Sequence, residues 1–363
     1  MSDTVPTRTG VANLPLHYGR APRWLFERMV SLAREITIAI VADFGAGEML
    51  RRLSHPYWFQ AFGCILGFDW HSSGVTTTLC GAIKEAIRGL ECDLGLFVAG
   101  GKGKTARRTP LELEDWGDSL SLDTSPLIYA SRMSAKVDSA AIQDGYQLYH
   151  HSFFFTAGGS WAVVQQGMNE ANRYARRYHW LGEQVSDFVN EPHSVILSQA
   201  RGEALNLVAG ESDQARKTIT GIATDEKPEQ IILDIKRIQI LTLPSRHQIY
   251  VNDLHPESLS RIMLRTYERQ PQGFEELLGL HGVGAKTLRA LSLVSELVHG
   301  VVPSYRDPTR YSFAHGGKDG IPYPVDRETF DRSIDILRKA VQMSKLGIRE
   351  KYEAVRRLSK LEK

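Results

Sequence analysis

Residues 277–291 contain the sequence feature that most constrains the fold of this chain. An apolar run precedes the tripeptide Gly282-Val283-Gly284, and a second apolar run with helical spacing begins at Ala285. Glycine adopts backbone conformations that are closed to other residues, so two glycines at this spacing allow a tight turn. The segment therefore predicts two helices that are joined by a short turn.

The start of the second predicted helix is open to an anion. The first amides of a helix have no partner within the helix, and they attract negative charge. The segment resembles the helix-hairpin-helix element of DNA repair enzymes, nucleases and ligases. That resemblance implies that Gly282, Gly284 and Lys286 contact the DNA backbone without reading its sequence. The alternative is an ordinary corner between two helices, in which glycine ends the first one.

The overall charge makes no global case for nucleic-acid binding. The 363 residues carry a formal net charge of +2, and their composition is that of a globular protein. Three scattered cysteines without a Cys-x-x-Cys motif argue against a cysteine zinc site and against a disulfide framework. The sequence has no signal peptide and no apolar stretch that could span a membrane. We therefore expect a cytoplasmic protein with no membrane contact.

The chain divides into two predicted regions around a polar linker at residues 221–230. Residues 1–220 combine helical patterns (22–44, 46–53, 56–66, 75–90, 133–142 and 202–220) with β-rich runs (94–98, 146–155 and 161–168). Residues 231–363 are helical apart from a polar insert at 303–324. We expect a mixed α/β N-terminal core with a β-hairpin, followed by an all-α C-terminal domain that contains the helix-hairpin-helix.

Gly158-Gly159 separates two β-rich runs and predicts the β-hairpin. A two-residue turn would pair Phe155 with Ala162 and His151 with Gln166. Because side chains alternate along a strand, this register places His150, Ser152 and Gln165 on one polar face. A shift of one residue would exchange the faces.

Candidate catalytic residues surround this hairpin: Lys136, Asp138, Asp144, His150 and Gln165. Mg²⁺ and Mn²⁺ bind oxygen ligands, usually carboxylates, so we expect Asp138 and Asp144 to hold one of these ions. The ion would activate water, and the lysine would stabilise developing charge on a phosphodiester. The arrangement resembles restriction-type nuclease cores, although Val164-Gln165-Gln166 stands where those cores have Glu-x-Lys. The alternative is a solvated helix that ends in a turn at Asp144.

A second polar group contains Asp69 and His71, which are candidate metal ligands or an acid–base pair. The alternative is structural, because Ser72 or Ser73 can cap the helix that follows. His193 stands alone after Glu191-Pro192, and we expect it to be a structural residue.

Two clusters of basic residues are further candidate DNA contacts. Lys102, Lys104 and Arg107 accompany the glycine-rich residues 100–105, which predict a clamp for backbone phosphates. Val98 occupies the position where a nucleotide-hydrolysing P-loop needs glycine, which excludes that motif. Arg176 and Arg177 are interleaved with aromatic residues that can stack on bases. The alternative for this second cluster is an amphipathic helix that packs its aromatic residues.

Eight motifs spread over the chain resemble one prokaryotic, largely archaeal family, the domain of unknown function numbered 763. They are Gly10-Val-Ala-Asn-Leu-Pro-Leu-His17, Gly67-Phe-Asp-Trp-His-Ser-Ser-Gly74, Gly100-Gly-Lys-Gly-Lys104, Lys136-Val-Asp138, Gln143-Asp-Gly145, Val164-Gln-Gln-Gly-Met168, Ala175-Arg-Arg-Tyr-His-Trp180 and Gly316-Gly-Lys-Asp-Gly320. The resemblance implies no activity, so the function has to be argued from the residues.

The sequence favours a metal-dependent deoxyribonuclease that acts in DNA repair or recombination. Its N-terminal core would hydrolyse phosphodiester bonds, and its C-terminal domain would bind the backbone of duplex DNA. A DNA glycosylase/AP lyase is the first alternative. Resemblance to that superfamily implies Lys286 as the nucleophile, with Asp307 or the more distant Asp326 as its aspartate. A non-catalytic DNA-binding adaptor is the second alternative.

Overall fold

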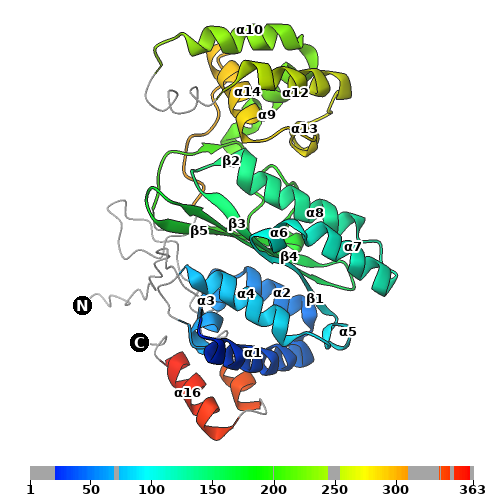
Figure 1. The fold of residues 1–363 in the computed structure, drawn as a ribbon, viewed down its shortest axis with the longest axis vertical. Coiled ribbons are helices and arrows are strands. Elements are labelled where there is room, and N and C mark those ends of the chain that lie inside the picture. The colour runs from blue at the N-terminus through cyan, green and yellow to red at the C-terminus, as the bar shows by residue number, and fades with distance from the viewer. Residues whose placement is uncertain are drawn as a thin grey trace, which may run out of the picture.

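The computed structural model describes residues 21–68, 73–198, 200–243, 254–309, 335, 337–343 and 347–359. These residues confirm a mixed α/β protein, with an antiparallel sheet in the middle and helices at both ends (Figure 1). Among the described helices, none is long and apolar enough to cross a membrane.

The central sheet has the strand order β1-β3-β4-β5-β6, and each neighbouring pair is antiparallel. Its strands are β1 (Leu96–Lys102), β3 (Gln147–Thr156), β4 (Trp161–Asn169), β5 (Tyr174–Leu181) and β6 (Val195–Leu197). A second, two-stranded sheet joins β2 (Ile142–Gln143) to β7 (Leu205–Asn206).

Helices cover both faces of the central sheet. One face is covered by α2 (Ala46–Ser54), α3 (Pro56–Ile65) and α4 (Gly74–Ala86), and α1 (Arg23–Phe44) packs on α2 and α4. Helix α5 (Glu91–Leu94) leads into β1. The other face packs against α7 (Thr109–Leu120), α8 (Ser125–Lys136) and the π-helical turn η1 (Val137–Ala141). Phe154 faces the first layer, whereas Phe153 and Phe155 face the second, because side chains alternate along a strand. Helix α6 (Lys104–Arg107) follows β1.

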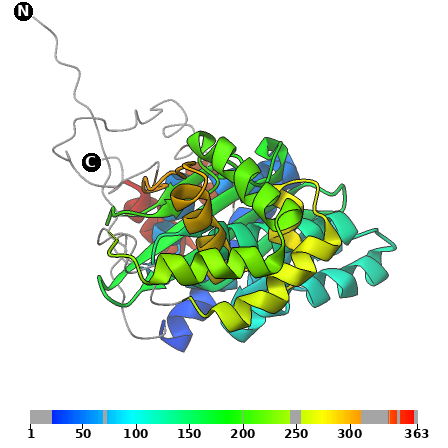
Figure 2. The same cartoon turned by 90° about the horizontal axis from the view of Figure 1, so that it is seen from above.

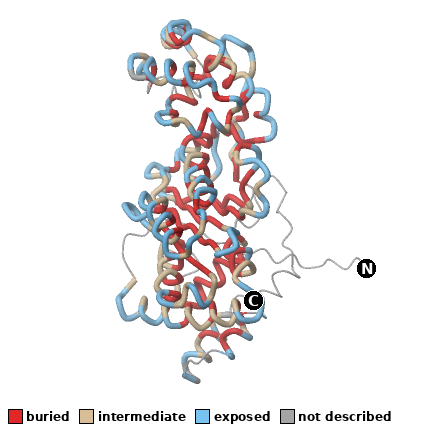
Figure 3. The backbone as a smooth tube through the Cα atoms, turned by 90° about the vertical axis from the view of Figure 1, so that its right-hand side faces the viewer, coloured by how far each residue is buried: buried red, intermediate tan, exposed pale blue. Residues whose placement is uncertain are grey.

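A helical unit lies at one end of the molecule (Figures 1 and 2). It contains α9 (Asp213–Asp225), α10 (Pro228–Gln239), α12 (Pro256–Arg269), α13 (Phe274–Gly279) and α14 (Ala285–Leu297). Its apolar residues belong to the same core as those of α7 and α8, so buried positions continue from the sheet into this unit (Figure 3). At the opposite end, α16 (Ile348–Ser359) contacts α3, where Arg357 Nη1 donates to Ile65 O at 2.7 Å.

The structure corrects three sequence expectations about the elements. The predicted linker at 221–230 is mostly helical, because α9 continues to Asp225 and α10 begins at Pro228. Its residues Ile222 and Ala223 are buried in the core. The helix expected over 202–220 starts only at Asp213, after β7 and the 3-10 turn η3 (Gly210–Ser212). The basic-aromatic segment with Arg176 and Arg177 is strand β5, not an amphipathic helix.

The predicted β-hairpin is confirmed, but its register is shifted by one residue. The loop is 157–160 rather than Gly158-Gly159 alone, and Thr156 N donates to Ser160 O across it at 2.9 Å. Phe154 therefore pairs with Ala162, and His151 pairs with Gln165. The shift brings Gln165 onto the face of His151, so His150 and Gln165 do not share one polar face as expected.

Candidate functional site

The turn between α13 and α14, residues 280–284, has the tight geometry that its glycines predict. Val283 N donates to Leu280 O at 3.2 Å, and the side chain of Val283 is buried beneath the turn. Gly282 has a φ of +94°, a conformation in which a β-carbon is strained. Helix α14 then begins with Gly284 as its N-cap, and no side chain caps this end.

The open end of α14 carries basic side chains on the exposed surface. Lys286 is exposed in the first turn of α14. Arg265 of α12 is also exposed, and its Nη1 donates to His281 O at 2.9 Å and lies 3.1 Å from His281 Nδ1. Within the described part of the chain, neither Lys286 nor Arg265 forms an ion pair with an acid. Helix amides and cations therefore converge at one solvent-facing turn.

Lys136 supports this turn from behind. Its Nζ donates to the backbone carbonyls of Leu278, Leu280 and Val283 at 2.7, 2.8 and 2.9 Å. Burial lowers the pKa of this half-buried amine. Lysine has three N–H donors, and here all three positions are used by carbonyls. Lys136 thus anchors the turn to the end of α8, and its catalytic role stays a prediction.

Asp138 lies at the centre of a buried hydrogen-bond network. Its Oδ2 accepts from Gln165 Nε2 at 2.5 Å and from Trp180 Nε1 at 3.0 Å. Its Oδ1 lies 2.5 Å from His193 Nε2, and the carboxylate has no solvent exposure. An ionised carboxylate can only accept a hydrogen bond, so His193 Nε2 carries the proton of this bond. Asp138 therefore orients His193.

The network continues through Gln165 into the sheet. His151 Nδ1 lies 2.8 Å from Gln165 Oε1, and Ser131 Oγ lies 3.0 Å from His151 Nε2. Burial lowers the pKa of His151, which favours the neutral ring. His150 belongs to the opposite face, where its Nε2 lies 3.1 Å from Ser152 Oγ and burial lowers its pKa to about 3. The predicted cleft with both His150 and Gln165 is therefore wrong.

Asp144 forms a second and separate network. Its Oδ2 accepts from Arg176 Nη1 at 2.8 Å and from Tyr178 Oη at 2.7 Å. Arg176 Nη2 also reaches Asp307 Oδ2 at 2.7 Å. Burial disfavours the guanidinium charge, but the two carboxylates outweigh it and raise the pKa of Arg176. Burial likewise raises the pKa of Asp144, against the opposing effect of Arg176.

Arg176 and Arg177 were expected to contact DNA, and the structure places both inside the protein. Their relative exposures are 1% and 0%, so neither can reach a phosphate on the surface. Arg177 points to the other face of the sheet, where its Nη1 donates to Gln60 Oε1 at 3.0 Å. Burial lowers the pKa of Arg177 to about 9. The two arginines of this strand therefore form contacts inside the protein.

The predicted metal ligands are not brought together as one open site. Asp138 and Asp144 each accept hydrogen bonds from protein donors, in different networks. The described residues contain no group of three or more His, Cys, Asp or Glu side chains that could hold a metal ion. Binding of Mg²⁺ or Mn²⁺ therefore stays a prediction. The other candidates, Asp69 and His71, lie outside the described residues, as does Asp326.

Lys102, Lys104 and Arg107 lie exposed at the end of β1 and in α6. The glycine-rich segment is part of the strand rather than a free loop, because Gly100 to Lys102 pair with β3. A β-carbon at Gly100 would stand 2.3 Å from His151 O, which explains glycine at this position without a ligand. DNA contact by the three cations stays a prediction.

His193 is the residue that sequence reasoning undervalued. It is separated from Asp138 by 55 positions, and no motif links the two residues. The only local signal was the position of the histidine directly after Pro192 in a polar loop.

Comparison with known proteins places the chain in a family but gives it no activity. No curated protein and no solved structure matches the chain significantly. The family described as "Protein of unknown function (DUF763)" matches residues 10–325. That match covers most of the 363 residues, so the chain is a member of the DUF763 family, as its motifs indicate.

Proposed function

We propose that this protein binds the DNA backbone, without reading sequence, through the turn between α13 and α14. The observation that carries the proposal is the environment of Gly284. Its φ of −138° is open to any residue, and a β-carbon built there meets no atom within 4 Å. Neither the backbone nor a neighbouring side chain requires glycine at this position. Close approach of the DNA backbone to this position would require glycine.

Charge and hydrogen-bonding capacity support the same surface. The first amides of α14 are uncapped, and the helix dipole favours an anion at this end. Exposed Lys286 and Arg265 add positive charge beside them. Phosphate is the repeating anion of DNA, and contacts of this kind position a duplex without specifying bases.

A matched pair of glycines tests the proposal. Gly273 is the N-cap of α13 and is also extended (φ −161°), and a β-carbon at this position would likewise meet no atom within 4 Å. We expect Gly284→Val to weaken binding to duplex DNA at least tenfold, and Gly273→Val to leave it unchanged. Fluorescence anisotropy with duplexes of unrelated sequence measures both, and circular dichroism checks folding. Equal affinity of the two folded variants would remove the turn from the DNA interface.

Cleavage of the bound DNA is a second part of the proposal. We propose hydrolysis that depends on Mg²⁺ or Mn²⁺, with Asp69 and His71 as the first candidate ligands, because the carboxylates of Asp138 and Asp144 already bind protein donors. Labelled single-stranded, duplex and forked DNA, incubated with EDTA, Mg²⁺ or Mn²⁺, tests this. Cleavage only with metal supports the nuclease. Binding with no cleavage in any condition supports the adaptor.

The glycosylase/lyase alternative depends on Lys286 acting as a nucleophile. One of its expected aspartates, Asp307, accepts from Arg176 Nη2 and from Gly202 N at 2.9 Å, in the network of Asp144. We expect Lys286→Arg to keep most DNA binding and any cleavage, because only charge is needed for phosphate contact. Arginine cannot replace an attacking amine. Borohydride is added to wild type and to Lys286→Arg with abasic DNA in EDTA. A trapped adduct with wild type but not with Lys286→Arg would favour the lyase over the nuclease.

A further inference from the structure

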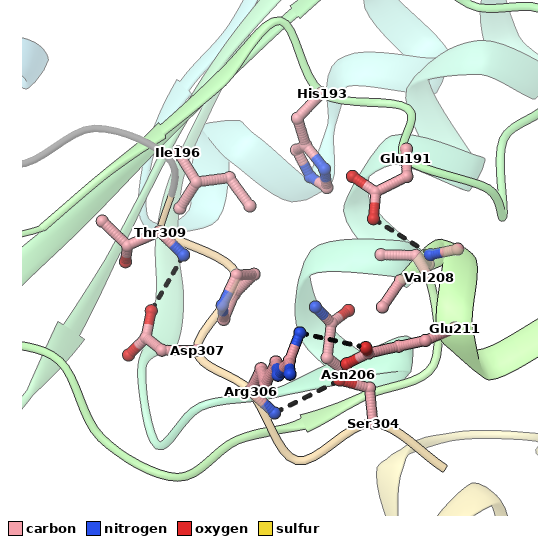
Figure 4. A pocket seen from close by; sticks show the side chains of 13 residues that line it. Glu191, His193, Ile196, Asn206, Val208, Glu211, Ser304, Arg306, Asp307 and Thr309 are labelled. Atoms are coloured by element: carbon pink, nitrogen blue, oxygen red, sulfur yellow. Dashed lines mark hydrogen bonds and ion pairs between the residues drawn. The ribbon is translucent and has the colours of Figure 1, made fainter. Parts of the chain in front are cut away.

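A pocket of about 360 Å³ lies beside the Asp138–His193 pair, between β6, β7 and the segment 304–309. Figure 4 shows the imidazole of His193 directed toward the middle of this pocket, with Asn206 directed toward it from the opposite side. Ile196, Val208 and Pro308 provide apolar surface. Pockets for small organic ligands typically combine such surface with a few polar groups, and have volumes from about 300 Å³ upward.

Asn206 has an unmet hydrogen-bonding requirement in this pocket. Its side chain is only 6% exposed, and its Oδ1 is buried with no partner among the described residues. A buried polar group without a partner destabilises the folded state, so an unpaired amide oxygen at this position needs an explanation. The amide torsion is broad and roughly two-fold, and no described residue fixes it. Rotation about this torsion would turn either the acceptor or the donor of Asn206 toward a ligand.

His193 complements this amide. Its Nε2 is directed to Asp138, and no described residue binds its Nδ1. The Nε2 proton is directed to Asp138, which leaves Nδ1 for contact with a ligand. A ligand between His193 and Asn206 has to bear N–H donors together with an acceptor. A side-chain amide paired with an adjacent donor and acceptor is the arrangement that recognises the edge of a nucleobase.

The described charged residues at the rim offer a phosphate group no cation that is not already paired with an acid. Three lining residues are acidic (Glu191, Glu211 and Asp307), of which Glu211 pairs with Arg306 at 3.2 Å and Asp307 pairs with the buried Arg176 at 2.7 Å. Such a rim favours a neutral heterocycle over a phosphate group, because no free cation in this described part of the chain offsets the negative charge of the phosphate.

We propose that this pocket binds a nucleobase, whose edge pairs with the Asn206 amide and whose N–H donates to His193 Nδ1. The base can belong to a free nucleoside or to a nucleotide turned out of a DNA strand, as enzymes that act on bases require. Only the second source rests on the proposed DNA-binding function.

Two titrations separate these sources. Isothermal titration with the four deoxynucleosides and their 5′-monophosphates tests the free ligand, and we expect the best nucleoside to bind at least tenfold more tightly than its monophosphate. Emission of 2-aminopurine placed in an oligonucleotide tests the extruded base, because the emission rises when this base leaves the stack. Gly284→Val should retain nucleoside binding even where it loses DNA binding, which distinguishes failure of the pocket from failure of the turn.

Asn206→Leu is the decisive variant, and Gln214→Leu, an exposed amide on α9, is its control. We expect Asn206→Leu to lose at least tenfold in nucleoside affinity without a fall in Tm, because it removes an unpaired buried oxygen. The control should change neither. Glu211→Lys, at the rim, should raise the affinity for the monophosphate several-fold and tests the pocket if Asn206→Leu does not fold. No nucleoside binding and no emission change by wild type, or unchanged binding by both pocket variants, would overturn the proposal.

Discussion

The turn between α13 and α14 and the two buried networks around Asp138 and Asp144 are opposite kinds of polar region. The turn has uncapped amides and, among the described residues, cations without acidic partners on the surface. The acidic residues are buried, and protein donors occupy their oxygens. Residue type suggested function in both regions. The difference teaches that the availability of a polar group to a ligand depends on its neighbours in the fold, which the sequence pattern does not state.

Lys136 links the two regions. It is two residues from Asp138 in sequence, and its amine holds the carbonyls of the turn. Gln143 makes a second link, since its Nε2 donates to Ala285 O at 2.9 Å and its Oε1 accepts from Arg289 at 2.9 Å. Lys136, a predicted catalytic residue, and Gln143 thus fix the position of the proposed DNA-binding turn. The two regions should respond differently to mutation.

The largest expected effect is on stability, at the buried ion pairs of Arg176 with Asp144 and Asp307. Arg176→Ala leaves the carboxylates of Asp144 and Asp307 buried without their cation, and breaking a buried pair in this way costs about 3–5 kcal/mol. Urea unfolding measures the loss. Arg132→Ala, at an exposed position on α8, is the control and should change stability by less than about 0.5 kcal/mol. Similar stabilities of the two variants would show that the ion pairs of Arg176 do not stabilise the fold.

Acid should weaken the sheet through its buried histidines. Unfolded histidine has a pKa of about 6.5, whereas burial lowers the pKa of His150 to about 3 in the folded protein. The unfolded state binds more protons between these values. Stability from His150 is therefore complete above about pH 6.5 and falls as the pH drops toward 3. Between pH 7 and 5 the loss is about 2 kcal/mol.

Comparison of wild type with His150→Gln isolates this contribution from other titrating groups. The stability difference between the two proteins should shift by that amount between pH 7 and pH 5, measured by urea unfolding. A constant difference would mean that His150 is accessible to protons in the folded state.

A smaller effect is expected where the two regions meet. Lys136→Met leaves three carbonyls without their donor, which should cost about 1–3 kcal/mol and should also weaken DNA binding because the turn loses its support. Thermal unfolding and fluorescence anisotropy measure the two effects. A variant that loses DNA cleavage but keeps wild-type stability and affinity would return Lys136 to a catalytic role.

The sequence predicted the elements that depend on local patterns. Helix α1 was expected at 22–44 from its apolar spacing and runs from Arg23 to Phe44. Strand β5 was missed because Arg176 and Arg177 interrupt its apolar character, and only the ion pairs and amide contacts of the folded state make their burial possible. The hairpin register failed because the loop is two residues longer than the glycine pair suggests.

The candidate sites likewise divide into a part set by local sequence and a part set by contacts between distant residues. The tight turn at 280–284 was predictable, because its glycines act on the adjacent backbone. The pairing of Asp138 with His193 joins positions 55 residues apart, and the networks that enclose Asp138 and Asp144 draw donors from β4, β5 and the loops beyond. These contacts depend on sheet order and register, which local patterns did not determine.

The salt dependence of DNA binding tests the central claim most directly. If Lys286 neutralises one phosphate, Lys286→Ala should reduce the slope of log affinity against log salt by about one unit, equally for duplexes of unrelated sequence. Lys236→Ala, at an exposed position on α10 of the same helical unit, should retain the wild-type slope. An unchanged slope and affinity in folded Lys286→Ala would contradict phosphate binding at the turn between α13 and α14.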